Sequence, residues 1–190
     1  MLSNNIKIIL VEPQTPGNIG AVARAMKTMS LSQLVLVRPA FFPHKDASIR
    51  ATHAKDILEN CKTADSLSEA ISDCRLVIGT SIRDRGNFVP GLSVKKATAK
   101  IIEEQVYSQV ALVFGTESHG MTGEDLRLCN YYAYIPSSPE FSSLNLASAV
   151  QIFCYELYQQ NELQKMKTCK QGSLYAESSI LHQDYPSNKQ

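Results

Sequence analysis

Short apolar runs of strand length alternate along this chain with segments that have the apolar periodicity of helices. The first run, residues 6–12, is rich in β-branched side chains and ends at Pro13. The predicted strands cover residues 6–12, 34–37, 75–80, 110–114 and 132–135, and the predicted helices cover residues 18–29, 51–61, 66–73, 93–106, 122–129 and 144–164. This alternation predicts an α/β fold with a mostly parallel sheet and helices on both faces.

The length of 190 residues fits one domain with a core of its own. Hydrophobic residues make up 44% of the chain and charged residues 19%, which is ordinary for a globular protein. Ser66 and Ser93 are expected to cap the helices that begin beside them. Periodicity is lost after Lys165, so we predict a globular domain over residues 1–164 and a flexible tail over residues 165–190.

The cysteines and the apolar runs exclude several classes of protein. Five cysteines are scattered along the chain without a C-x-x-C pair, so neither a zinc site nor a disulfide framework is expected. No apolar run reaches the roughly 18 residues that a membrane span needs, and the N-terminus lacks the pattern of a signal peptide. The sequence therefore predicts a cytoplasmic protein with no metal and no membrane association.

The net charge of +1 hides an uneven distribution. Residues 1–100 hold 14 Lys and Arg against 8 Asp and Glu, whereas residues 101–190 hold 5 against 10. A positive first half suits a polyanionic partner, although solvated surfaces are often equally uneven.

The first turn with unusual chemistry leads from residues 6–12 into a helix. Gly17 and Gly20 permit a close approach of the backbone to another group. Asn18 and Arg24 lie less than two helical turns apart, and Arg24 is placed to bind a phosphate or carboxylate with two N–H groups. A solvent-facing Arg on an amphipathic helix explains the pattern equally well. The turn matches neither a P-loop nor a complete G-x-G-x-x-G fingerprint, which disfavours NTP hydrolysis and NAD chemistry.

Two further turns follow predicted strands. One reads Gly115-Thr116-Glu117-Ser118-His119-Gly120-Met121, and its glycines indicate backbone amides and one carboxylate that meet a polar or cationic ligand. His119 is a candidate general base there, but a single loop His is more often a solvated surface residue. The other turn reads Gly79-Thr80-Ser81-Ile82-Arg83-Asp84-Arg85. Its two arginines could hold phosphates, and a charged mobile loop is the alternative.

A Pro- and Ser-rich loop leads into the last predicted helix. Pro136 and Pro139 deny this loop regular structure, and its serines can bind a ligand or cap the helix. Asn145 stands between two leucines at the start of that helix, which is unusual for a core helix and lies where α/β proteins bind ligands. Taken alone, the segment is explained more simply by a surface loop before a capped helix.

Together these turns resemble the three motifs of the SPOUT methyltransferases, and among them the TrmH-like RNA ribose 2'-O-methyltransferases. Asn18 with Arg24 resembles the first motif, and Gly115-x-Glu117-x-x-Gly120 resembles the second. The third is matched by Ile135-Pro136 and Ser143-Leu144-Asn145-Leu146-Ala147. The sequence from Val11 to Lys27 is most similar to that of the TrmJ subfamily, and the resemblance covers about residues 6–160. Two features depart from it: Met121 replaces a usual leucine, and the C-terminal region is shorter than the extension with which bacterial TrmJ proteins hold tRNA.

The resemblance implies a fold with a deep C-terminal trefoil knot, a homodimer, bound S-adenosylmethionine, and methylation of a ribose 2'-hydroxyl at position 32 of tRNA. It implies catalytic roles for Arg24, Asn18 and Ser143, with Arg24 helping to deprotonate the hydroxyl or stabilising the charge that develops there. It implies that Arg83 and Arg85 bind RNA. The residues that it places in the cofactor pocket are Gly79, Thr80, Ser81, Gly115, Thr116, Glu117, Gly120, Ile135, Pro136, Leu144 and Asn145.

Three alternatives stay open. The same chemistry could act on another tRNA position or on ribosomal RNA. A non-catalytic RNA-binding module could share the fold, although Arg24, Asn18 and Asn145 together argue against it. The chain could also be an unrelated nucleotide-binding domain, but its sequence contains no phosphate-binding loop motif to support that reading.

Overall fold

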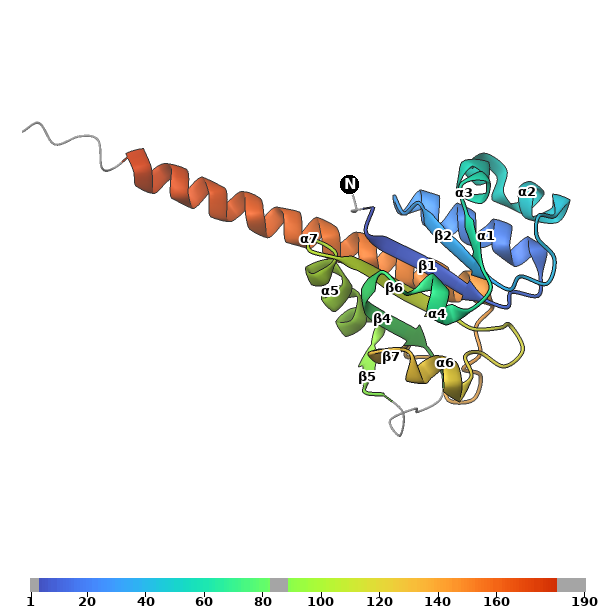
Figure 1. The fold of residues 1–190 in the computed structure, drawn as a ribbon. Coiled ribbons are helices and arrows are strands. Elements are labelled where there is room, and N and C mark those ends of the chain that lie inside the picture. The colour runs from blue at the N-terminus through green and yellow to red at the C-terminus, as the bar shows by residue number, and fades with distance from the viewer. Residues whose placement is uncertain (1–3, 83–88, 181–190) are drawn as a thin grey trace, which may run out of the picture.

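The computed structural model describes residues 4–82 and 89–180, with side chains described as far as residue 167. Within these residues seven strands form one sheet in the order β3-β2-β1-β6-β4-β7-β5 (Figure 1). Every pair of neighbouring strands is parallel. The strands are β1 (Ile6–Val11), β2 (Gln33–Val37), β3 (Lys62–Ala64), β4 (Cys74–Thr80), β5 (Gly91–Ser93), β6 (Gln109–Phe114) and β7 (Tyr131–Tyr134).

Helices cover both faces of the sheet, which confirms the predicted α/β class. They are α1 (Pro16–Thr28), α2 (Lys45–Ala51), the 3-10 turn η1 (Thr52–Ala54), α3 (Lys55–Glu59), α4 (Leu67–Ala70), α5 (Val94–Glu104), α6 (Gly123–Arg127) and α7 (Leu146–Ile180). Alternation along β1 assigns its side chains to two cores. Ile8 and Leu10 pack in the core shared with α1, α5 and α7, whereas Ile9 and Val11 pack in the core shared with α4 and α6.

Several element boundaries differ from the prediction. The strands β3 and β5 were missed because each has only three residues and pairs along one edge. The helix expected over residues 51–61 is α2, η1 and α3, and it begins at Lys45. In α1, Pro16 occupies the first turn, so the helix starts earlier than the expected Asn18.

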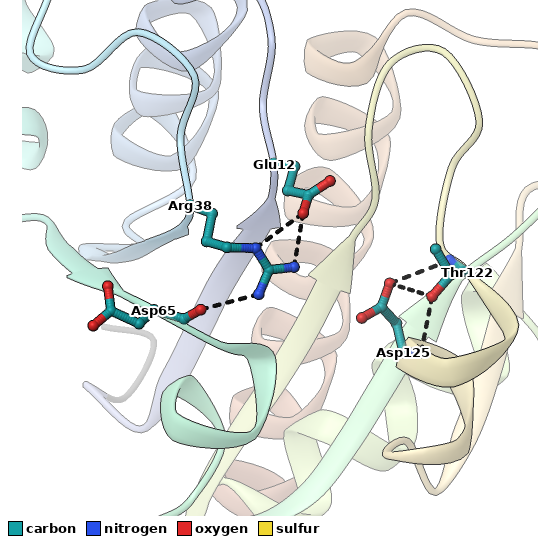
Figure 2. Close-up of polar contacts among 5 residues, drawn as sticks. All are labelled: Glu12, Arg38, Asp65, Thr122 and Asp125. Carbon is teal, nitrogen blue, oxygen red and sulfur yellow. Dashed lines mark hydrogen bonds and ion pairs between the residues drawn. The ribbon is translucent and has the colours of Figure 1, made fainter.

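Of the two helix caps predicted from the sequence, the one at Ser66 is present and the one at Ser93 is not. The Ser66 hydroxyl accepts a hydrogen bond from the Glu69 amide at 3.1 Å at the start of α4. Thr122 and Asp125 form a reciprocal capping box at the start of α6 (Figure 2). Ser93 was expected to cap α5, but its side chain makes no capping hydrogen bond, because the residue also ends β5.

The last helix was expected to end at Gln164, but α7 continues to Ile180. Figure 1 shows it extending away from the sheet and the other helices. The apolar periodicity on which the prediction depended is lost in the sequence after Lys165, so the pattern did not indicate the rest of the helix. The flexible tail over residues 165–190 and the C-terminal knot stay predictions. No helix among the described residues is both long enough and apolar enough to cross a membrane.

The central strands β1, β6, β4 and β7 are neighbours, and their carboxyl ends lie at one edge of the sheet. The pairing register matches Leu10 with Phe114 and Thr80 with Ala133. The loops that follow these strands therefore emerge together. This edge is where parallel α/β sheets bind ligands.

Candidate functional site

A cleft opens at this edge, between the ends of β4, β6 and β7 and the first turns of α7. Its floor is apolar: the rings of Phe114 and Phe153 meet edge to face with their centroids 5.6 Å apart. Eight of the residues predicted for a cofactor pocket line it, namely Thr80, Ser81, Gly115, Thr116, Glu117, Gly120, Ile135 and Leu144. Ser143 lines it as well. Three turns that are distant in sequence thus form one concave surface.

Two glycines shape the loop after β6. The amide of Thr116 donates to the Gly120 carbonyl at 3.2 Å, and the Gly120 amide donates to the Thr116 carbonyl at 2.9 Å. A Cβ at Gly115 would lie 2.1 Å from the carbonyl carbon of Gly120, so no other residue fits there without movement of the backbone. Gly120 has a φ of 70°, which glycine adopts without strain. The loop is therefore held closed across the cleft.

Glu117 at the tip of this loop turns its carboxylate toward the start of α1. One oxygen accepts a hydrogen bond from the Gln14 amide at 2.9 Å, and the other accepts from the Thr15 amide and the Asn18 side chain, both at 3.0 Å. Burial by itself would raise the pKa of the Glu117 carboxyl, but these hydrogen bonds outweigh it and lower the pKa below its ordinary value. The carboxylate therefore joins the loop after β6 to the turn at the start of α1, which itself does not line the cleft.

Asn145 brings in the third turn. Its side-chain amide donates to the Asn18 carbonyl oxygen at 3.1 Å. Its own carbonyl oxygen accepts from the Ala147 amide at 2.9 Å and caps α7. A continuous chain of hydrogen bonds thus runs from Glu117 through Asn18 and Asn145 to the first turn of α7. The polar residue between two leucines is explained by this chain and by the cap.

Other predicted site residues lie apart from the cleft. Arg24 is exposed on α1, is not among the lining residues, and makes no side-chain hydrogen bond or ion pair with the other residues that the structure describes. Gly79 does not line the cleft: an added Cβ would lie 2.8 Å from the Met121 sulfur and 2.9 Å from Leu126 of α6. Pro136 is exposed beside the cleft but does not line it. Arg83 and Arg85 lie outside the described residues.

The cleft also includes residues that were not predicted for the cofactor pocket. His119 is exposed as expected, yet it lines the cleft, with its Nδ1 2.7 Å from the Ser118 hydroxyl. The remaining additions are Ile82, Phe114, Met121, Ala133, Ser142, Leu146, Ala149 and Phe153. Phe114 and Ala133 stand at or near strand ends, and Leu146, Ala149 and Phe153 follow helical spacing. These two patterns could have located them from the sequence.

The chemistry of the cleft suits an amphipathic ligand. Phe114, Ile135 and Leu144 offer apolar surface for a planar ring, while Thr80 and Ser143 offer hydroxyls. The closed loop from Gly115 to Gly120 brings main-chain groups to the same wall. Among the described residues no group of three or more His, Cys, Asp or Glu side chains could hold a metal ion.

Comparison with known proteins gives one consistent family. The profile of the SpoU rRNA Methylase family matches residues 5–155. A Pseudomonas aeruginosa protein described as tRNA (cytidine/uridine/adenosine-2'-O-)-methyltransferase TrmJ is 50% identical over 155 residues, which are 81% of this chain and 60% of that protein. A Pectobacterium atrosepticum relative described as tRNA (cytidine/uridine-2'-O-)-methyltransferase TrmJ is 47% identical over 81% of this chain and 64% of its own length. The chain thus spans about three fifths of the length of these relatives.

Solved structures agree with this result. A probable methylase family protein from Haemophilus influenzae superposes with a TM-score of 0.82 at 38% identity, covering 99% of this chain and 74% of that one. TrmJ from Z. mobilis superposes with a TM-score of 0.76 at 35% identity, covering 91% of this chain and 81% of that one. Both likenesses extend over nearly all of the structure.

Proposed function

Because this chain belongs to the SpoU rRNA methylase family, we propose that it transfers a methyl group from S-adenosylmethionine to a ribose 2'-hydroxyl of tRNA, at the cytidine or uridine of position 32. The observation that carries the proposal is the hydrogen-bonded chain Glu117–Asn18–Asn145, which joins the turn at the start of α1 and the start of α7 to the cleft that Glu117 lines. The names of the relatives at 50% and 47% identity support the same activity. The chain would act in the cytoplasm, where tRNA is modified.

The cleft would hold the cofactor. Ile135 and Leu144 would cover the adenine ring, and the hydroxyls of Thr80 and Ser81 and the main chain of residues 115–120 would bind its polar groups. S-adenosylmethionine supplies an electrophilic methyl group on a sulfonium sulfur. Glu117 would have two roles. It contacts the ligand from the wall of the cleft, and it fixes the shape of the pocket through the hydrogen bonds that it accepts from Gln14, Thr15 and Asn18.

The RNA would approach the open side of the cleft. Ser143 lines the cleft and would orient the ribose, and Asn18 would position the groups around it. The Arg24 guanidinium is free of ion pairs with described residues, so it is available to an RNA phosphate and to the charge that develops on the 2'-oxygen. Arg24 does not line the cleft of its own chain, so it would act on the RNA and not on the cofactor. Arg83 and Arg85 would bind the RNA backbone.

A homodimer is part of the proposal. Tyr155, Leu163 and Met166 are exposed on α7, and at 100° per residue they fall within a sector of about 80°. A second copy of the chain would cover this stripe. Sedimentation velocity checks it: we expect a species of twice the mass, and Met166→Glu should shift the equilibrium toward the monomer.

The activity is tested with unmodified tRNA transcripts and S-adenosylmethionine carrying a labelled methyl group. We expect incorporation of label that stops at one ribose per transcript, mapped by resistance of the adjacent phosphodiester to alkali. A transcript with a 2'-deoxy nucleotide at position 32 is the matched control and should accept no methyl group. Equal incorporation into both transcripts would exclude position 32.

A second target within tRNA has one specific support. A structure described as insights into the 2-OH methylation of C/U34 on tRNA superposes with a TM-score of 0.64 at 26% identity. The alkali map separates positions 32 and 34, and the same assay with ribosomal RNA tests that alternative. A chain that binds RNA but no S-adenosylmethionine would instead be a non-catalytic module.

A further inference from the structure

Two residues at the edge of the sheet adopt a backbone conformation that side chains disfavour. Glu12 follows β1 and Arg38 follows β2, and their φ angles are 47° and 44°. This left-handed region is uncommon for residues other than glycine, and it persists where the surrounding contacts enforce it. Contacts with other parts of the chain must therefore hold the backbone of Glu12 and Arg38 in this conformation.

Side-chain contacts supply that restraint (Figure 2). The Arg38 guanidinium donates to one oxygen of Glu12 from Nε at 2.9 Å and from Nη2 at 2.7 Å, and its Nη1 donates to the Asp65 carbonyl at 3.0 Å. The backbone adds two bonds: the Glu12 amide donates to Val37, and the Arg38 amide donates to Ala64. A single guanidinium thus joins the residues that follow β1, β2 and β3.

The restrained backbone leads directly to the cleft. The Ala40 amide donates to the Pro13 carbonyl at 3.2 Å, so the next residue after Glu12 is also held. The two residues that follow, Gln14 and Thr15, present their amides to Glu117. The direction of these amides depends on the backbone at positions 12 and 13. Arg38 is therefore connected to Glu117 through Glu12 and the backbone of residues 12–15.

We propose that the ion pair of Arg38 and Glu12 is a positioning element of the active site. It holds the segment from Glu12 to Thr15 so that two amides fix the Glu117 carboxylate, and it does not contact a ligand bound in the cleft, since neither residue lines it. This inference rests on the proposed methyltransferase function. It assigns a catalytic consequence to a surface ion pair that the sequence motifs do not include.

A purely structural role can be separated from positioning because the chain holds a matched ion pair. Lys27 and Asp56 also pair at 2.7 Å, with side-chain exposures of 47% and 52%, against 47% and 49% for Arg38 and Glu12. Half-exposed pairs of this kind contribute little to folding stability. Asp56 does not contact Glu117 or line the cleft. Substitution of Asp56 therefore measures how much the loss of a half-exposed ion pair alone lowers the stability and the activity.

The experiment compares Arg38→Ala, Glu12→Gly and Asp56→Ala in thermal unfolding and in methyl transfer to tRNA. We expect Arg38→Ala and Asp56→Ala to lower the unfolding temperature equally, while only Arg38→Ala lowers kcat, by about 10- to 100-fold. Glycine adopts positive φ freely, so Glu12→Gly should lower kcat without lowering the unfolding temperature. Arg38→Lys, which keeps the charge but not the planar fork, should give an intermediate kcat.

A second readout does not need activity. The amide protons of Gln14 and Thr15 should shift as Glu117 is titrated with acid in nitrogen-edited NMR spectra, and Arg38→Ala should weaken that shift at both amides. Wild-type kcat in Arg38→Ala, or an equal loss of kcat in Asp56→Ala, would overturn the inference. Unchanged titration in Arg38→Ala would also overturn it. If the wild-type chain methylates no RNA, the proposed function fails, and the titration still tests the positioning of Glu117.

Discussion

The side-chain amide of Asn145 donates to the side-chain carbonyl of Asn18 at 3.1 Å, although 127 residues separate them in the sequence. The same Asn145 caps α7 through its carbonyl oxygen. One residue therefore sets both the start of the last helix and the position of the first turn. Substitutions that keep one of these roles and remove the other can tell them apart.

Asn145→Ala should lose both roles. Removal of an N-cap costs about 1 kcal/mol of stability, and loss of the bond to Asn18 should weaken binding of S-adenosylmethionine. Asn145→Ser keeps a capping hydroxyl but cannot reach Asn18 in the same way, so it should weaken cofactor binding at nearly wild-type stability. Calorimetric titration and thermal unfolding check this pair. Unchanged affinity in both variants would remove Asn145 from the cofactor site.

Arg24→Ala should abolish methyl transfer and leave the affinity for S-adenosylmethionine nearly unchanged, because Arg24 does not line the cleft. Loss of a group that stabilises developing charge lowers kcat by about 100-fold or more. Single-turnover methylation at saturating tRNA measures the chemical step, and calorimetry measures the cofactor. Lys27→Ala, at the next exposed cation of α1, is the control and should keep its rate. Wild-type turnover in Arg24→Ala would refute the assignment.

Gly115→Ala should disrupt the loop across the cleft, because its Cβ would lie within 2.3 Å of three backbone atoms of Gly120 and Met121. We expect cofactor binding to fall below detection by calorimetry. Gly17→Ala is the matched change: its Cβ would meet the Arg50 Cγ at an ordinary 3.6 Å, and alanine favours the helix. That variant should bind the cofactor normally and unfold at the same or a higher temperature.

Glu117 should make stability depend on pH in a defined direction. Its pKa is lower in the folded protein than its ordinary value of 4.5, so the ionised carboxylate stabilises the fold above that pH. The contribution is lost as the pH falls through the lower folded-state pKa. Glu117→Gln should therefore reduce the unfolding temperature most at pH 7, with the difference from wild type shrinking as the pH falls below 4.5. An equal difference at pH 7 and pH 3 would contradict the role of its charge.

The central strands and the turns after them were predictable, because buried parallel strands are continuous apolar runs and the turns hold glycines and polar residues. The sequence at Gly20 indicated a close backbone approach, and the structure has one, because an added Cβ there would lie 2.1 Å from the Ala47 carbonyl oxygen. The short strands β3 and β5 lack such runs, and their strand conformation depends on pairing with β2 and β7. The length of α7 was hidden for a related reason, since the apolar periodicity of the sequence ends near Lys165 although the helix continues to Ile180.

The sequence alone determined the α/β class, the positions of the central strands and the residue types at the three turns, because these follow from patterns of a few neighbouring residues. Only the tertiary structure decided how those side chains are used. The strand order places β1, β6 and β7 so that Glu117 meets Asn18, and Asn18 meets Asn145, across separations of 99 and 127 residues. Hydrogen bonds over such separations depend on register and backbone direction in distant segments. No local pattern encodes these, so the sequence placed Glu117 beside a ligand, and the fold turned its carboxylate toward Gln14 and Thr15.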